Sequence, residues 1–188
     1  MLYKIFTNII SLTLVFTFNV YFEILKLFGK KIVVFYFGAI GSFENHDILI
    51  SEIINKIKKK KFIFFKISEV YNKNTIFNFI NMRFIKYLNS ANIIITNTVD
   101  RNLPSNSTNI LIPHDFYDTF SNFKNYQKIG FYKDSKLIQY DFIFCSNVVV
   151  KKFYEKKIKQ IKKKISLKKY IKKTSAIIMG YYKYDFIQ

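Results

Sequence analysis

The sequence is poor in the residues that build disulfide frameworks, zinc sites and loop-rich folds. Its 188 residues include one cysteine, Cys145, two prolines, five glycines and no tryptophan. A single cysteine excludes an intramolecular disulfide and any zinc site with several cysteine ligands. So little glycine and proline excludes a fibrous or loop-dominated chain. Half of the residues are hydrophobic, which excludes a disordered chain and allows a sizeable core.

Arginine is also scarce, although the chain is strongly basic. The 31 basic and 12 acidic residues give a net charge of +19, and only Arg83 and Arg101 are arginines. Direct readout of bases favours the planar guanidinium group, so we expect no nucleic acid partner. Lysine is concentrated in residues 151–173, which hold twelve lysines and one acid, Glu155. This stretch predicts a helix with an apolar stripe and a basic face, either solvated or bound to an anionic membrane surface.

The N-terminal stretch Ile5–Phe22 contains no charged residue. Its 18 residues are close to the minimum for a membrane span, although threonine, serine and asparagine interrupt it. It lacks the small-residue cleavage site of a signal peptide. More lysines follow it than precede it, among them Lys26, Lys30 and Lys31, which predicts a cytoplasmic location for the body of the chain. Three interpretations stay open: a membrane anchor or in-plane helix, a helix packed on the domain, and a poorly ordered start.

Short apolar runs alternate with amphipathic stretches in the rest of the chain. The runs predicted as strands are 31–37, 62–67, 92–97, 110–112, 142–146 and 176–179. The stretches predicted as helices are 45–60, 75–90 and 151–173. Continuous apolar strands separated by helices predict the α/β class: a Rossmann-like parallel sheet of about six strands with helices on both faces, preceded by a hydrophobic N-terminal helix.

Glycine, histidine and acidic residues gather just after the predicted strands. Gly38–Asp47 follows the first, Pro113–Asp118 the fourth and Gly180–Asp185 the sixth. Ligands of open parallel sheets bind outside the carboxyl ends of the strands, so we expect the functional site there. The first of these segments lacks the complete dinucleotide fingerprint and the Walker lysine, and a tight turn that caps a helix is the alternative.

His114 is the candidate general base, because histidine titrates near neutral pH. Asp115 or Asp118 would orient its ring. A metal site made of these three residues is the alternative, but the chemistry does not require one, and we expect neither metal nor cofactor. Cys145 lies inside an apolar strand, where a free cysteine is usually a small hydrophobic residue, so we do not expect a thiol nucleophile.

The strand followed by Gly38–Asn45, and the apolar strand that runs into Pro113-His114-Asp115, resemble the N-terminal lobe of the CDP-glycerol glycerophosphotransferase family. These enzymes build teichoic-acid-like or capsular glycerol-phosphate polymers. Tyr140–Ser146 resembles the family segment in which Asp, an apolar strand and Ser precede a helix, and Gly180–Asp185 is similar to its Gly-x-Pro-Arg-x-Asp stretch. Asp115 and Tyr182 stand where the family pattern has Gly and Pro.

The resemblance implies a role for each segment. The catalytic residues would be His114, Asp115 and Asp118. The acceptor-binding residues would be Gly38, Gly41, Ser42, Asn45 and His46. Contacts between lobes would involve Gly180, Tyr182 and Asp185. The implied domains are a hydrophobic helix at 1–30, an acceptor-side lobe at 31–180 and the start of an inter-lobe connection at 181–188, with the donor-binding C-terminal lobe absent.

The expected function is therefore the acceptor-binding part of a glycerophosphotransferase of cell-wall or capsule biogenesis. It would use a lipid-linked or polymeric acceptor at the cytoplasmic face of the membrane, and a CDP-linked donor only when a C-terminal lobe is supplied, so the chain alone would be inactive. The membrane-surface residues would be Lys151, Lys152, Lys162, Lys163 and Lys164. The alternatives are the acceptor lobe of another surface-polysaccharide glycosyltransferase and a non-enzymatic basic membrane-binding module.

Overall fold

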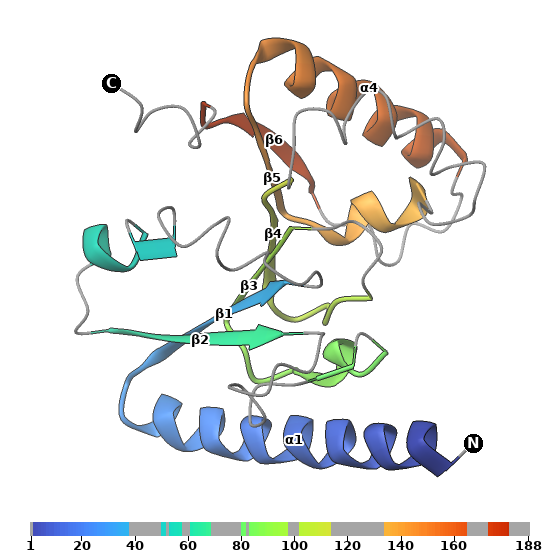
Figure 1. Ribbon diagram of the computed structural model, residues 1–188. Helices are drawn as coiled ribbons and strands as arrows, with labels where there is room; N and C mark the ends of the chain where they lie inside the picture. Colours follow the sequence, from blue (N-terminus) through green and yellow to red (C-terminus); the bar gives the residue numbers. More distant parts are fainter. Residues whose placement is uncertain are drawn as a thin grey trace. The chain divides into compact units, whose positions relative to one another are not determined.

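The computed structural model describes residues 2–37, 50–51, 53–57, 61–68, 80–81, 83–97, 102–113, 134–164 and 173–180. Six strands form one parallel sheet (Figure 1). Their order across the sheet is β2 (Phe62–Ser68), β1 (Lys31–Phe37), β3 (Ile93–Thr96), β4 (Thr108–Leu111), β5 (Phe142–Cys145) and β6 (Ser175–Ile178). The predicted α/β class, with its six-stranded parallel sheet and apolar N-terminal helix, is confirmed.

The chain divides into two compact units, each with its own core. The first comprises Met1–Ile95 and Arg101–Thr108, and the second comprises Thr96–Asp100 and Asn109–Gln188. Helix α1 (Leu2–Leu27) belongs to the first unit together with β1 and β2. The second unit holds β5 and β6, the 3-10 helix η3 (Asp134–Gln139) and helix α4 (Val148–Lys164).

Strand β1 forms the centre of the first core. Its residues from Ile32 to Phe37 are all buried, as expected for a continuous apolar strand of a parallel sheet. Phe35 stacks on Phe64 of β2, with ring centroids 6.2 Å apart. The hydroxyl group of Tyr36 donates a hydrogen bond to the carbonyl oxygen of Ile80 at 3.0 Å, so the one polar atom of this strand's aromatic side chains is satisfied.

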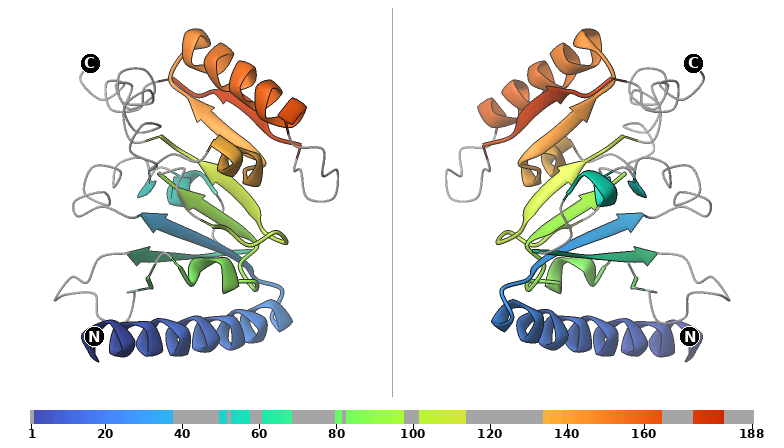
Figure 2. Two further views of the ribbon diagram at one scale, coloured as in Figure 1. Left: turned by 90° about the vertical axis from the view of Figure 1, so that its right-hand side faces the viewer. Right: turned by 90° about the vertical axis from the view of Figure 1, so that its left-hand side faces the viewer.

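Helix α1 packs lengthwise on the first unit through a cluster of aromatic rings (Figures 1 and 2). The ring of Phe65 in β2 lies 4.7 Å from that of Phe22, 6.0 Å from that of Tyr21 and 6.1 Å from that of Phe18. Gly29 ends the helix with a φ of 70°, a conformation that costs glycine little, and the chain then turns into β1. One face of α1 thus packs against the sheet, and the choice between a packed and a membrane-associated helix stays open.

Polar side chains on the same face of α1 bind the backbone of residues 81–90. Asn19 donates from Nδ2 to the carbonyl oxygen of Tyr87 at 2.7 Å. The backbone N–H of Ser90 donates to Oδ1 of Asn19 at 3.0 Å, and that of Asn81 donates to the hydroxyl oxygen of Ser11 at 3.1 Å. Each bond joins residues about 70 positions apart in the chain, so α1 is held in a defined orientation.

The predicted helix over 75–90 is wrong in its described part. Residues 83–90 form turns around one short 3-10 helix, η2 (Ile85–Tyr87). Oδ1 of Asn81 accepts the backbone N–H of Arg83 at 3.1 Å, a local bond that competes with helix formation. Of the apolar positions of this pattern that the structure describes, Ile80 and Leu88 are buried, whereas Phe84 is half-buried and Tyr87 is 45% exposed, so the helical stripe is kept only in part.

Helix α4 begins at Val148, three residues before the predicted start. Oδ1 of Asn147 accepts the backbone N–H groups of Val149 at 2.9 Å and Val150 at 3.0 Å, which is a side-chain cap of the helix N-terminus. Of the predicted apolar stripe, Tyr154, Ile158 and Ile161 are buried and Ile165 lies outside the described residues; Val150 extends the buried face by one turn. The buried side chains face β5, β6 and η3.

One side chain just before β3 and another just before β5 each extend a strand ladder. Oδ1 of Asn92 accepts the backbone N–H of Ile32, in β1, at 2.7 Å. Oδ2 of Asp141 accepts the backbone N–H of Asn109 in β4 at 2.8 Å. The backbone N–H of Asn92 and that of Asp141 donate in return to the carbonyl oxygens of Ile32 and Asn109. Both pairs thereby align neighbouring strands at their amino ends.

We predict that Asp141→Ala lowers the free energy of unfolding by about 1–3 kcal/mol, because the N–H of the buried Asn109 would lose its acceptor. Asp141→Asn is the matched control, since its amide oxygen can still accept this bond. Urea unfolding followed by far-UV circular dichroism measures both variants. Equal midpoints for Asp141→Ala and the unchanged chain would show that this bond does not hold the strands.

Candidate functional site

Strands β4, β5 and β6 of the second unit end at one edge. Leu111 pairs with Ile143 and Cys145 pairs with Ile178, all in parallel register. The ladder continues for one residue, since the backbone N–H of Met179 donates to the carbonyl oxygen of Cys145 at 2.9 Å. The described residues that follow these strand ends are Pro113, Ser146, Asn147 and Gly180. This carboxyl edge is where an open parallel sheet binds ligands.

Two of these residues shape the backbone at the edge. Gly180 has a φ of 81°, which strongly favours glycine, and the chain leaves the edge there. Asn147 caps α4, so the N–H groups of Val149 and Val150 are already bonded within the chain. The capped helix therefore contributes its positive end to the edge, while these two amide groups are occupied.

Most of the predicted site residues lie outside the described residues. They are Gly38, Gly41, Ser42, Asn45, His46, His114, Asp115, Asp118, Tyr182 and Asp185. His114 directly follows Pro113, and Tyr182 comes two residues after Gly180. The structure thus brings Pro113, which precedes His114, and Gly180, which lies two residues before Tyr182, to the same edge of the second unit. The roles of these side chains remain predictions.

A buried polar pair lies beneath the edge and was not predicted. The hydroxyl groups of Thr96 and Tyr140 are 3.2 Å apart, and both residues are fully buried. The backbone N–H of Ile112 donates to the carbonyl oxygen of Thr96 at 2.8 Å, which holds the chain just before Pro113. Asn97, directly after β3, is also buried. An asparagine that ends an apolar run was the one available signal in the sequence.

The lysines predicted to meet a membrane lie on α4, and their contact with a membrane stays a prediction. Lys152, Lys162 and Lys163 are exposed, and Lys151 is half-buried beside Glu155, with 3.8 Å between the charged atoms. The side chain of Lys164 is outside the described part of the helix. Helix α4 turns its apolar stripe inward and its charged side chains outward.

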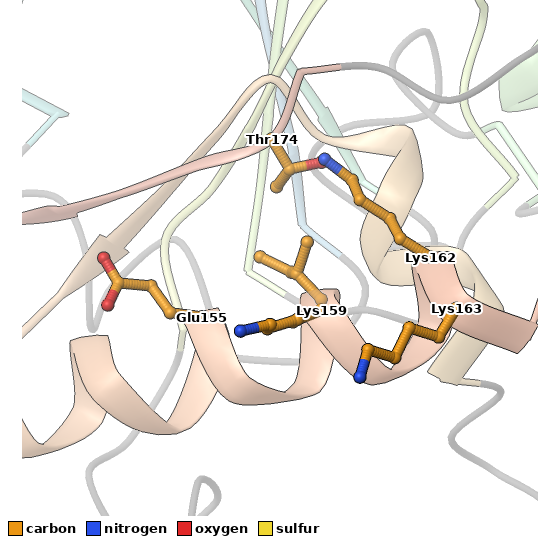
Figure 3. A pocket seen from close by; sticks show the side chains of 6 residues that line it. Glu155, Lys159, Lys162, Lys163 and Thr174 are labelled. Carbon is orange, nitrogen blue, oxygen red and sulfur yellow. The ribbon is translucent and has the colours of Figure 1, made fainter.

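A shallow pocket of about 390 Å³ lies along α4 (Figure 3). Its lining residues are Glu155, Ile158, Lys159, Lys162, Lys163 and Thr174. Lys162 points toward Thr174, whereas Glu155 points away from it (Figure 3). The three lysines would attract anions, but they are surface residues that water also satisfies.

The buried thiol group of Cys145 is not a nucleophile. Burial, helped by the nearby Glu155 carboxylate, raises its pKa to about 11. Sγ lies 3.6 Å from the carbonyl oxygen of Ile143, to which it donates. Among the described residues, no three His, Cys, Asp or Glu side chains are grouped closely enough to hold a metal ion.

Comparisons of the chain with protein-family models, curated proteins and solved structures find no match. Membership of the glycerophosphotransferase family therefore stays a prediction from the resemblance of Gly38–Asn45 and Pro113–Asp115. The function has to be argued from the residues and the fold of this chain.

We predict that Cys145 resists alkylation at neutral pH in the folded chain and reacts once urea unfolds it, because only the thiolate attacks. A folded-state pKa above the unfolded value stabilises the fold below about pH 9, and this contribution is lost as the pH rises to about 11. Mass spectrometry after iodoacetamide treatment measures the reaction. Equal rates in the folded and unfolded chain would contradict the assignment.

Proposed function

We propose that the chain is the acceptor-binding lobe of a glycerophosphotransferase that extends a teichoic-acid-like or capsular polymer. The observation that supports this proposal best is the convergence of Pro113, Asn147 and Gly180 at the carboxyl edge of β4, β5 and β6. His114 directly follows Pro113 in the chain, and the carboxyl edge of a parallel sheet is where such a fold presents catalytic groups. The resemblance of the adjoining segments supplies the reaction class.

In the proposed reaction, His114 removes the proton from a hydroxyl group of the acceptor. The oxygen then forms a bond to the glycerol-bearing phosphorus of the CDP-linked donor, and the bond from this phosphorus to CMP breaks. Asp115 or Asp118 would orient the imidazole ring. Positioning and charge stabilisation dominate phosphoryl transfer, so a second lobe that holds the donor would be needed as well.

The acceptor would be lipid-linked or polymeric and would be met at the cytoplasmic face of the membrane. The described part of the chain includes one helix, α1, that is long and apolar enough to cross a membrane. The lysines that follow it favour a cytoplasmic location for both units. An enzyme held at this surface would meet a lipid-linked acceptor by diffusion in two dimensions.

A different surface-polysaccharide glycosyltransferase would use the same fold and the same edge. It would differ in the donor, because a nucleotide sugar transfers its sugar without the phosphate. Donor choice is therefore the observation that separates the two enzymes. A non-enzymatic basic module would transfer nothing from either donor.

We predict that this chain transfers glycerol phosphate only when a donor-binding lobe of the family is added, and that His114→Ala lowers the rate about 10²–10⁴-fold. The assay follows radiolabelled CDP-glycerol into membranes that carry the acceptor, with UDP-sugars as competing donors. Gln160→Ala, on the exposed side of α4, is the control and should keep the full rate.

Two results would contradict the proposal. One is rapid turnover by the 188-residue chain alone, which would remove the need for a second lobe. The other is an unchanged rate for His114→Ala in the complemented enzyme. Incorporation from a UDP-sugar but not from CDP-glycerol would assign the chain to the alternative transferase.

A further inference from the structure

Helix α1 turns its apolar side chains away from the protein. Ile5, Ile9, Leu12, Phe16, Val20 and Leu27 form a stripe at helical spacing, and each is between 46% and 86% exposed. A surface helix of a globular protein normally turns its apolar stripe inward. An outward stripe that runs the length of a helix marks a contact with something other than water.

The inward face of the same helix carries polar side chains that the fold uses. Ser11 and Asn19 accept the backbone N–H groups of Asn81 and Ser90, and Asn19 also donates to the carbonyl oxygen of Tyr87. The inward face therefore combines the buried side chains of Val15 and Phe22 with polar groups that are bonded to the protein, and the outward apolar stripe is a second apolar face. The exposed apolar stripe on the outer face is therefore available to contact a partner.

The outer face has the chemistry of a hydrocarbon contact. The stretch Ile5–Leu27 has a mean hydropathy of 1.6, and only 17% of it is buried inside the protein. The exposed hydroxyl group of Thr17 donates to the carbonyl oxygen of Thr13 at 2.9 Å, so this polar atom is satisfied within the helix. Such back-bonding is what allows threonine to face lipid.

Charged groups beside the stripe fit anionic lipid headgroups. Arg83 and Lys86 are exposed on the segment that binds α1 through Tyr87 and Ser90. The acidic residue of the helix, Glu23, has a pKa lowered by hydrogen bonds from Ser90 and Lys26, and its carboxylate lies 2.9 Å from Nζ of Lys26. The negative charge of Glu23 is therefore paired with the positive charge of Lys26.

We propose that α1 lies in the plane of the membrane interface, with its outer face in lipid and its inner face on the first unit. This inference rests on the membrane location in the proposed function but not on the transferase chemistry. The helix is long enough to span a bilayer. Spanning, however, would detach it from Phe65 and expose the amide group of Asn19 to hydrocarbon. The in-plane position keeps every one of these contacts.

Vesicle sedimentation of the full chain tests the outer face. Vesicles of phosphatidylcholine with and without phosphatidylglycerol are the probe, and no donor or acceptor is added. We expect binding that anionic lipid strengthens, and roughly tenfold or more weaker partitioning for Phe16→Asp, whose side chain is 71% exposed. Gln160→Asp makes a similar charge change on the exposed side of α4 and should bind like the unchanged chain.

Several results would overturn the proposal. One is that Phe16→Asp binds vesicles as well as the unchanged chain does. Another is that only the double variant Lys152→Gln/Lys156→Gln loses binding, which would assign the membrane contact to α4. A dimer that ignores vesicles and that Phe16→Asp dissociates would make a second copy the partner. Circular dichroism of each variant ensures that the folded chain is compared. Glycerol-phosphate transfer to a water-soluble acceptor would still test the proposed function separately.

Depth measurements separate an in-plane helix from a spanning one. In a Cys145→Ala background, Ile5→Cys, Phe16→Cys and Leu27→Cys each carry a fluorophore that brominated lipids quench. An in-plane helix places all three labels at one shallow depth. A spanning helix places the central label deep and separates the outer two by roughly 30 Å across the hydrocarbon core, which would overturn the proposal.

Discussion

The alignment of neighbouring strands in each unit depends on one side chain that supplies a hydrogen-bond acceptor at the amino end of a strand. Asn92 does this for β1 and Asp141 for β4. A shift of one residue would turn every side chain of a strand to the other face, so these bonds protect both cores. They also fix the register of the neighbouring strands at their amino ends. In the second unit the result is the edge that Pro113, Asn147 and Gly180 share.

The strands were predictable because each is a continuous apolar run, which is typical of a strand that is buried on both faces of a parallel sheet. The turns at residues 83–90 were not predictable, because the apolar spacing also suits a helix, whereas the hydrogen bond between Asn81 and the N–H of Arg83 favours a turn. The start of α4 was missed because Asn147 lies in a strand-end motif rather than beside a visible helix signal. For the candidate site, the sequence indicated the strand ends that Pro113, Asn147 and Gly180 follow, while most of the predicted site residues lie outside the described part of the chain.

The outward face of α1 could not be read from the sequence either. Apolar residues lie on most sides of this helix, so periodicity alone does not say which side the protein covers. The choice is made by Ser11 and Asn19, whose partners Asn81 and Ser90 lie about 70 residues away. The buried face of α4, in contrast, could be predicted, because the lysines of this helix leave only one side apolar.

The most direct test of whether α1 binds the membrane while it stays docked on the rest of the first unit is hydrogen–deuterium exchange. It is measured at the N–H groups of Asn81 and Ser90, with and without anionic vesicles. These two groups donate to α1 itself. If α1 stays docked while its outer face enters lipid, both remain as protected on vesicles as in solution, and the amide groups of α1 become more protected. Loss of protection at Asn81 and Ser90 on bound vesicles would mean that α1 leaves the first unit to insert, and would contradict the account.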